Sequence, residues 1–148
     1  MKILVDADAC PVKEIIVAVA KEYDIPVIMF FDTSHVYEDG YSKVVIVDKG
    51  RDQVDFALIN YLQQDDLVIT QDYGVACMAL AKKAQAINQN GLIFTNSNIE
   101  SLLHTRYNNQ LLRRMTKRVK GPKKRTNEND EIFHQQLIKL IKRSVVNE

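Results

Sequence analysis

Aspartates follow four apolar, strand-like runs of this chain, and their repeated placement indicates an acidic site. The carboxyl ends of parallel strands lie along one edge of a sheet, so these carboxylates are expected to meet there. Gathered carboxylates repel one another unless a cation lies between them, and hard oxygen ligands suit Mg²⁺ or Mn²⁺. The candidate ligands are Asp6 and Asp8 after residues 2–5, Asp52 and Asp55 after 44–47, and Asp72 after 67–70, with Asp32 after 27–31 as a weaker candidate.

Each of these aspartates also has an ordinary structural explanation. Asp6 and Asp72 lie at strand–helix turns, where an aspartate often caps the next helix, and Asp8 could do the same. Asp52 and Asp55 fall at the start of an expected helix, where acidic residues are favoured by the helix dipole alone. Asp55 lies between two apolar residues in a stretch that should be partly buried, which makes it the better site candidate of that pair.

A few other residues have chemical potential without a strong pattern. Thr70 could donate a hydrogen bond to a carboxylate or a phosphate oxygen, and we assign it a supporting role together with His35. His104 is a further candidate, although a lone histidine is more often structural. Cys10 and Cys77 are too far apart to suggest a zinc motif or a disulfide framework, and we expect both to be small buried residues.

The net charge of +1 conceals a strong separation of charge along the chain. Residues 1–100 carry a net charge of −7, residues 101–127 carry +9, and residues 128–148 carry −1. Basic segments of this kind often meet phosphate backbones, and Tyr107 offers a ring for base stacking. A solvated face that compensates the acidic body is the alternative. The candidate nucleic-acid-binding residues are Arg113, Arg114, Lys117, Arg118, Lys120, Lys123, Lys124 and Arg125.

Apolar runs alternate with segments of helical periodicity, which predicts an α/β fold with a doubly wound, mainly parallel five-stranded sheet flanked by helices. Residues 32–42 have no clear period and are expected to form a loop. We expect one α/β domain over 1–120 that includes the basic helix, a polar linker over 121–130, and a C-terminal amphipathic helix over 131–148 that packs on the domain or on a partner. The expected strands are 2–5, 27–31, 44–47, 67–70 and 92–94, and the expected helices are 11–22, 51–63, 75–86, 99–119 and 131–145.

The composition is that of an ordinary globular domain, with 46% hydrophobic and 26% charged residues in 148. No apolar run approaches the ~18 residues that a membrane span needs. The N-terminus lacks the basic and apolar regions of a secretory leader. We therefore expect a cytoplasmic protein with no membrane partner, for which a homodimer is one expected arrangement.

Several motifs together resemble the YaiI/YqxD family of uncharacterised bacterial proteins. They are VDADACPV at 5–12, GRDQVD at 50–55, TQDYG at 70–74, and HTRYN at 104–108 followed by LLRRMTKRVKGPKKRT at 111–126. The same residues are similar, more distantly, to PIN-like nucleases, which cut RNA with Mg²⁺ or Mn²⁺. That resemblance implies a PIN-like fold with Asp6, Asp55 and Asp72 as catalytic residues, supported by Asp8 and Asp52. The chain departs from the PIN-like pattern by doubling its first acid and by the irregular loop at 32–42.

The hypothesis that follows is a ribonuclease that hydrolyses phosphodiesters with a divalent metal and binds RNA through its basic helix. One alternative is an RNA-binding module that keeps the acidic pocket without turnover. A less favoured alternative is a haloacid-dehalogenase-like phosphatase, because that class begins with Asp-x-Asp after its first strand. Against the phosphatase, the acidic pair Asp65 and Asp66 precedes a strand instead of following one.

Overall fold

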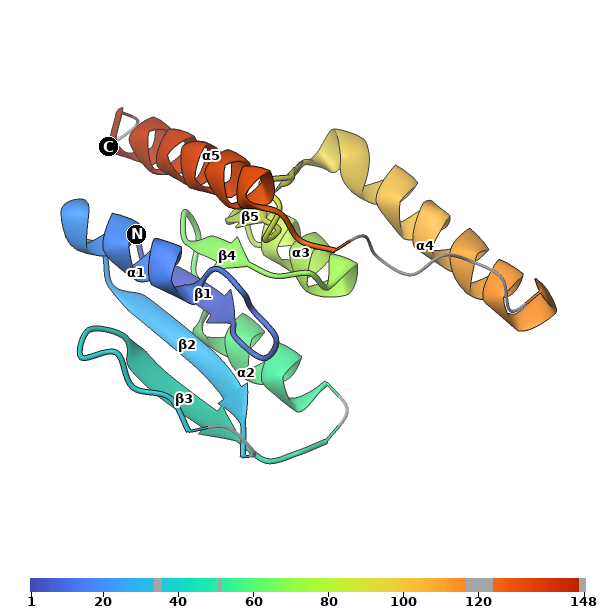
Figure 1. Ribbon diagram of the computed structural model, residues 1–148, viewed down its shortest axis with the longest axis horizontal. Helices are drawn as coiled ribbons and strands as arrows, with labels where there is room; N and C mark the ends of the chain where they lie inside the picture. Colours follow the sequence, from blue (N-terminus) through green and yellow to red (C-terminus); the bar gives the residue numbers. More distant parts are fainter. Residues whose placement is uncertain (34–35, 51, 117–123, 147–148) are drawn as a thin grey trace.

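The computed structural model describes residues 1–33, 36–50, 52–116 and 124–146, and within these it shows one six-stranded sheet with helices on both faces (Figure 1). The α/β class and the mostly parallel sheet are confirmed. The elements are β1 (Ile3–Asp6), α1 (Lys13–Glu22), β2 (Val27–Asp32), β3 (Lys43–Val47), α2 (Gln53–Tyr61), β4 (Leu67–Ile69), α3 (Tyr73–Ala81), β5 (Gln85–Ile87), β6 (Ile93–Phe94), α4 (Asn96–Thr116) and α5 (Asn127–Val146).

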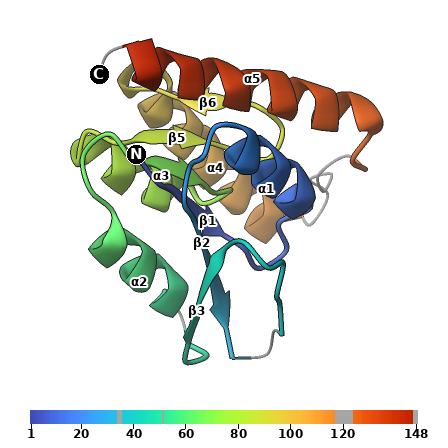
Figure 2. The same ribbon diagram turned by 90° about the vertical axis from the view of Figure 1, so that its left-hand side faces the viewer.

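The strand order β3-β2-β1-β4-β5-β6 puts the first strand in the middle of the sheet (Figure 2). The first five strands run parallel, and β6 returns antiparallel to β5. From β1 the chain proceeds outward in one direction to β2 and β3, and later in the other direction through β4 and β5. The order therefore reverses between β1 and β4, and the crevice at such a reversal is where open α/β sheets bind ligands.

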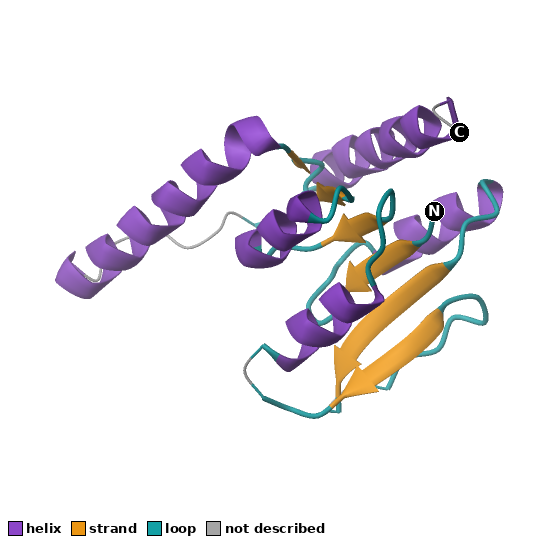
Figure 3. Ribbon diagram, turned by 180° about the vertical axis from the view of Figure 1, so that it is seen from behind, coloured by secondary structure: helices purple, strands orange, loops and turns teal. Residues whose placement is uncertain are grey.

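Two apolar layers fix the helices on the sheet. One layer joins α1 and α5 to the sheet face that carries Val5 and Met29, and the other joins α2 and α3 to the face that carries Leu4 and Phe30. Figures 1 and 3 show the two pairs of helices on opposite faces. Because β1 and β2 are covered on both faces, their runs are apolar without alternation.

The sheet contains a strand that the sequence analysis missed. The alanine-rich run 75–86 was expected to be one helix, but α3 ends at Ala81 and residues 85–87 form β5. Lys83 takes a left-handed conformation with φ 63°, which turns the chain before Ala84 enters the core. A three-residue strand carries too short a pattern to be recognised, and the alanines favour a helix by propensity.

The two C-terminal helices differ in how they contact the body. α5 starts at Asn127, earlier than the expected residue 131, and buries Phe133, Leu137 and Ile141 in the layer beneath α1. α4 starts against the core but then extends away from it, as Figure 1 shows. No helix in the described part of the chain is both long and apolar enough to cross a bilayer.

The leucines of α4 are only partly covered. Leu102 and Leu103, near its start, pack against the layer beneath α2 and α3. Leu111, Leu112 and Met115, farther along the helix, are exposed, Met115 by 79%. The far half of α4 therefore presents its apolar and basic side chains to solvent together.

Candidate functional site

Asp6, Thr70 and Asp72 meet at the crevice between β1 and β4. The Thr70 hydroxyl donates a hydrogen bond of 3.1 Å to Oδ2 of Asp6, and it accepts one of 3.0 Å from the Asp72 backbone N–H. Thr70 is buried, with 2% of its surface exposed. One threonine therefore joins the end of β1 to the turn after β4 through two hydrogen bonds.

The surroundings of the Asp6 carboxyl disfavour its ionised form. Its pKa is raised from 3.8 to about 6, chiefly by burial and further by the charges of Asp55, Asp72 and Asp8, while the Thr70 hydrogen bond lowers it. Among the described residues, Thr70 supplies the one hydrogen bond to this carboxyl and no basic side chain pairs with it. A buried carboxyl whose pKa is raised further by neighbouring carboxylates is typical of a site that binds a cation or a proton.

Asp72 serves as a helix cap, which is the ordinary explanation weighed for it. Its Oδ1 accepts hydrogen bonds from the N–H groups of Gly74 at 2.8 Å and Val75 at 3.1 Å, at the first turn of α3. Within the described residues no hydrogen bond reaches its Oδ2. The cap therefore fixes the orientation of the carboxylate and leaves its second oxygen available to a ligand.

Asp52, Asp55 and Asp72 line one open cleft, which Arg106 of α4 closes on one side. Asp52 directly precedes α2 with φ 65° and makes no capping hydrogen bond, so its side chain is placed there without a cap, as the helix dipole alone would allow. Burial raises the pKa of Asp55, and the charges of Asp72 and Asp52 raise it further. A guanidinium nitrogen of Arg106 lies 4.0 Å from Oδ1 of Asp72 and brings a cation to the rim of the acidic cleft.

Asp8 does not join this cleft in the way predicted. Its Oδ2 accepts a hydrogen bond of 3.2 Å from the backbone N–H of Asp32, so it ties the loop after β1 to the end of β2. Asp8 does not cap α1 either, because the helix begins at Lys13 and its N-cap residue is Val12, with no side-chain capping hydrogen bond. Asp8 contributes charge to the surroundings of Asp6, and its observed contact is structural.

The carboxylates do not form a closed metal cage. Among the residues that the structure describes, no three histidine, cysteine or acidic side chains are grouped closely enough to hold an ion by themselves. Mg²⁺ in phosphate-processing sites is usually held by one or two carboxylates, with waters and substrate phosphates completing its shell. Asp55 and Asp72 line the same cleft and are two carboxylates of the type that such an ion uses, while Asp6 lies outside the lining of that cleft.

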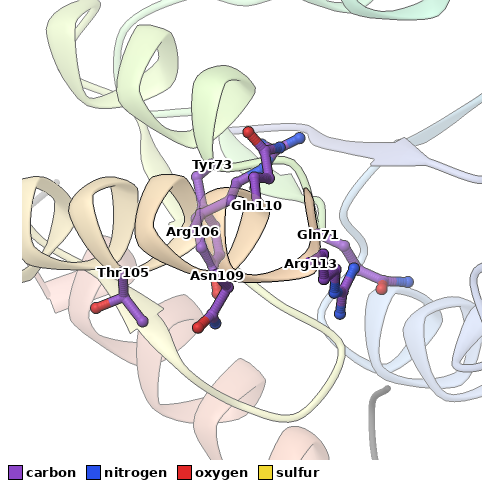
Figure 4. A pocket seen from close by; sticks show the side chains of 7 residues that line it. All are labelled: Gln71, Tyr73, Thr105, Arg106, Asn109, Gln110 and Arg113. Carbon is purple, nitrogen blue, oxygen red and sulfur yellow. The ribbon is translucent and has the colours of Figure 1, made fainter. Parts of the chain in front are cut away.

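A second, polar cleft adjoins the acidic one through Arg106. It lies between α4 and the turn after β4, and Figure 4 shows the side chains that line it. They are Gln71, Tyr73, Thr105, Arg106, Asn109, Gln110 and Arg113. Of these, the sequence analysis had singled out Arg113 alone. The three- and four-residue spacing of Arg106, Asn109, Gln110 and Arg113 was the available signal, because it places them on one helix face.

The predicted basic residues divide into several groups. Arg113 and Arg114 are exposed on α4, and Lys124 is exposed beyond it. Arg125 is occupied instead, because its guanidinium binds Asp130 at 2.7 Å, the Asn90 side chain at 2.7 Å and the Gln89 carbonyl at 2.8 Å. It clamps the start of α5 to the β5–β6 turn. The predicted residues Lys117, Arg118, Lys120 and Lys123 lie outside the described part of the chain, as does His35.

The remaining candidates take no part in the acidic cleft. His104 is exposed on α4. Cys10 is buried, and burial raises the pKa of its thiol. Cys77 is exposed on α3, so the expectation that both cysteines are buried is wrong for it. The acidic pair considered for a phosphatase, Asp65 and Asp66, precedes β4 and so lies at the opposite end of that strand from Thr70.

Comparisons with known proteins identify relatives along nearly the whole chain. The sequence model described as "Uncharacterized BCR, YaiI/YqxD family" matches residues 4–143. A "UPF0178 protein" of Ruminiclostridium cellulolyticum is 56% identical over 142 residues, which cover 96% of this chain and 93% of the relative. A "UPF0178 protein" of Lachnoclostridium phytofermentans is 52% identical over 145 residues, which cover 96% of this chain and 97% of the relative. No solved structure matches the chain significantly.

Proposed function

We propose that this chain, which belongs to the YaiI/YqxD family, is a divalent-metal-dependent ribonuclease of PIN-like type. The observation that supports it most is the position of Asp6 at the strand-order reversal, where burial and then the charges of Asp55 and Asp72 raise its pKa to about 6. These three carboxylates come from positions 49 and 17 residues apart along the chain. Capping explains the placement of Asp72 and the helix dipole suits Asp55 in the first turn of α2, whereas Asp6 has a hydrogen bond from Thr70 and no cationic partner among the described residues.

In this proposal Asp6, Asp55 and Asp72 hold Mg²⁺ or Mn²⁺ at the carboxyl edge of the sheet. The ion supplies Lewis-acid activation of the phosphate and a lowered pKa for an attacking water. Thr70 fixes the position of Asp6 through its 3.1 Å hydrogen bond, and the α3 cap fixes Asp72. Arg106, at the rim, attracts a phosphate group to the edge of the carboxylates, where the negative charge alone would repel it.

The basic residues of α4 supply affinity for the RNA backbone. Arg106, Arg113 and Arg114 extend from the acidic cleft along the exposed half of the helix. Contacts of guanidinium groups to phosphates are largely independent of sequence and weaken as salt concentration rises. The acidic body and the basic helix thus take separate roles, one in chemistry and the other in holding the substrate.

The experiment is a cleavage assay on a labelled RNA that contains both paired and unpaired regions, with Mn²⁺ or with EDTA. Asp72→Asn keeps the cap, because an asparagine oxygen accepts the same hydrogen bonds, and removes the charge alone. We expect Asp6→Asn, Asp55→Asn and Asp72→Asn each to reduce Mn²⁺-dependent cleavage by on the order of 100-fold or more. Asp48→Asn removes one charge from an exposed position after β3 and should leave cleavage intact. Full cleavage by the Asp6 and Asp72 variants would refute the proposal.

A second candidate function is RNA binding without turnover. The lack of a closed cluster of three ligands among the described residues, and the use of Asp72 Oδ1 as a cap, favour it. It predicts salt-sensitive RNA binding that is weakened by replacing Arg113 and Arg114, with no RNA product at any Mn²⁺ concentration. The same assay therefore separates the two candidates.

A further inference from the structure

We propose that the polar cleft beside α4 holds one unpaired purine base of an RNA ligand, next to the acidic cleft. This inference rests on the proposed function, because it assigns a base preference to the same substrate. The basic helix alone would bind any RNA by its phosphates. The cleft adds side chains that can distinguish one base from another.

The composition of the cleft carries the argument. Its seven lining residues include three amides (Gln71, Asn109 and Gln110) and two guanidiniums (Arg106 and Arg113), and none of the seven is acidic. Figure 4 shows Thr105, Arg106, Asn109, Gln110 and Arg113 on α4, with Gln71 and Tyr73 contributed by the turn after β4 and the start of α3. Amides offer a donor and an acceptor side by side, and a guanidinium offers a fork of donors. This set suits a base edge with adjacent hydrogen-bonding groups.

That chemistry favours purines. Asparagine and glutamine pair with N6 and N7 of adenine through two hydrogen bonds, and arginine pairs with O6 and N7 of guanine in the same way. Pyrimidines have no N7 and form neither of these pairs, so their two-bond contacts with an amide or a guanidinium are confined to the Watson–Crick edge, whereas a purine offers two edges. An unpaired RNA base exposes these edges, whereas the deep, narrow major groove of an RNA duplex hides them.

One wall of the cleft is rigid enough to support a base. Tyr73 lies in the first turn of α3 and is partly buried, with its ring edge-on to Phe94 at a centroid distance of 5.7 Å. The neighbouring Gln71 side chain donates a hydrogen bond to the side-chain oxygen of Gln89. An aromatic ring that is already fixed loses little conformational entropy when a base stacks on it.

The cleft is also correctly placed for a substrate of the acidic site. Gln71 and Tyr73 flank Asp72 in the chain, and Arg106 lines both clefts. A nucleotide with its base against Asn109 and Gln110 would therefore have its phosphate near Arg106, beside Asp55 and Asp72. The preferred cleavage position would lie within a nucleotide or two of a purine.

The test measures binding of fluorescently labelled hexanucleotides in EDTA, where no cleavage competes. The probes are oligo(A), an alternating A/G sequence, oligo(U) and oligo(C), titrated with wild type, Asn109→Ala/Gln110→Ala and Asn108→Ala. All three positions are exposed on α4, so alanine should keep the helix intact. Asn108 adjoins the pair but does not line the cleft, which makes it the matched control.

We expect wild type and Asn108→Ala to bind the purine probes about tenfold more tightly than the pyrimidine probes, and the double variant to lose this preference while keeping its affinity for oligo(U). Equal affinity of wild type for all four probes, no binding to any, or an unchanged preference in the double variant would each overturn the purine site. Cleavage is scored separately. Purine-selective binding without Mn²⁺-dependent cleavage refutes the nuclease and keeps the purine site, whereas cleavage with no purine bias refutes the purine site and keeps the nuclease.

Discussion

The two ends of the β1–β4 strand pair each contain an aspartate carboxyl group, but the surroundings of the two groups differ in charge. At the amino end, Asp66 is 4% exposed and pairs with the Lys2 ammonium at 2.5 Å. It also accepts hydrogen bonds from the backbone N–H groups of Lys2 at 3.1 Å and Gln63 at 2.9 Å. At the carboxyl end, Asp6 receives one hydrogen bond from Thr70 and faces other carboxylates.

This difference separates structural acids from candidate functional ones. A buried carboxylate that has its own cation and two amide donors contributes to the stability of the fold. A buried carboxylate that is surrounded by like charges costs stability, and proteins retain such groups mainly at functional sites. The contrast between Asp66 and Asp6 therefore supports the carboxyl end as the site, and it can be tested by mutation.

The largest expected effect is at the amino end. Asp66→Ala should reduce the free energy of unfolding by about 3 kcal/mol, because it leaves the Lys2 ammonium and two backbone N–H groups without their partner. Chemical denaturation at pH 7 measures this loss. Asp48→Ala, at an exposed position, should change stability by less than about 0.5 kcal/mol. A loss below 1 kcal/mol for Asp66→Ala would remove the contrast between the two ends.

At the carboxyl end, replacing the aspartate should increase the free energy of unfolding instead of reducing it. The pKa of Asp6 is about 6 in the folded chain against 3.8 for an unperturbed aspartate, so the unfolded state releases this proton first as pH rises. The Asp6 contribution is therefore unfavourable above pH 6 and vanishes below about pH 4. We expect Asp6→Asn to raise the free energy of unfolding by about 2 kcal/mol at pH 7 and by nothing at pH 4.

The comparison of Asp6→Asn with wild type should be made by denaturation in EDTA at several pH values, with Asp48→Asn as the control for loss of one negative charge. A pH-independent difference, or a loss of stability at pH 7, would mean that the Asp6 charge is compensated within the fold. The site argument would then lose its electrostatic basis.

Asp39, in the loop between β2 and β3, provides a third carboxylate for this comparison. Burial opposes the ionisation of Asp39, but hydrogen bonds from the Tyr37 hydroxyl and from the N–H groups of Ser42 and Tyr41 outweigh it and lower its pKa to about 2. Its stabilisation is thus present above about pH 4 and is lost as pH falls toward 2. Asp39→Ala should cost about 1.5 kcal/mol at pH 7 and progressively less in acid, measured by thermal unfolding. A cost that does not decline between pH 4 and pH 2 would contradict this role for Asp39.

The sequence was sufficient for the central strands and for the edge on which the aspartates lie, because both follow from local patterns. Apolar runs covered on both faces predicted β1, β2 and β4. The strand β5 was missed because three residues after an alanine-rich helix carry no period of their own.

The roles of single aspartates depended on contacts between remote residues. Asp6 and Thr70 are 64 residues apart, and Asp8 accepts a hydrogen bond from a backbone N–H 24 residues away. Local sequence spacing therefore could not tell that Asp6 is a candidate site residue and that Asp8 makes a structural contact. The polar cleft was missed for the same reason, since it forms only because α4 lies beside the turn after β4. Arg106 illustrates the point, because its ion pair with Asp72 joins the two clefts.

The smallest expected effect concerns the binding of Mg²⁺ at the carboxyl end. A ligand that binds only the folded state stabilises it, by about 1 kcal/mol when its concentration is five times its dissociation constant. For a chain of this size such a gain corresponds to a rise of about 2–4 °C in Tm. We therefore expect millimolar Mg²⁺ to raise the Tm of wild type and of Asp48→Asn, but not that of Asp6→Asn or Asp55→Asn, with ionic strength held constant by KCl. Thermal unfolding followed by circular dichroism measures the shift. An equal rise in all four proteins would show that Mg²⁺ only screens the acidic body, and the amino and carboxyl ends of the strand pair would then differ in charge without differing in function.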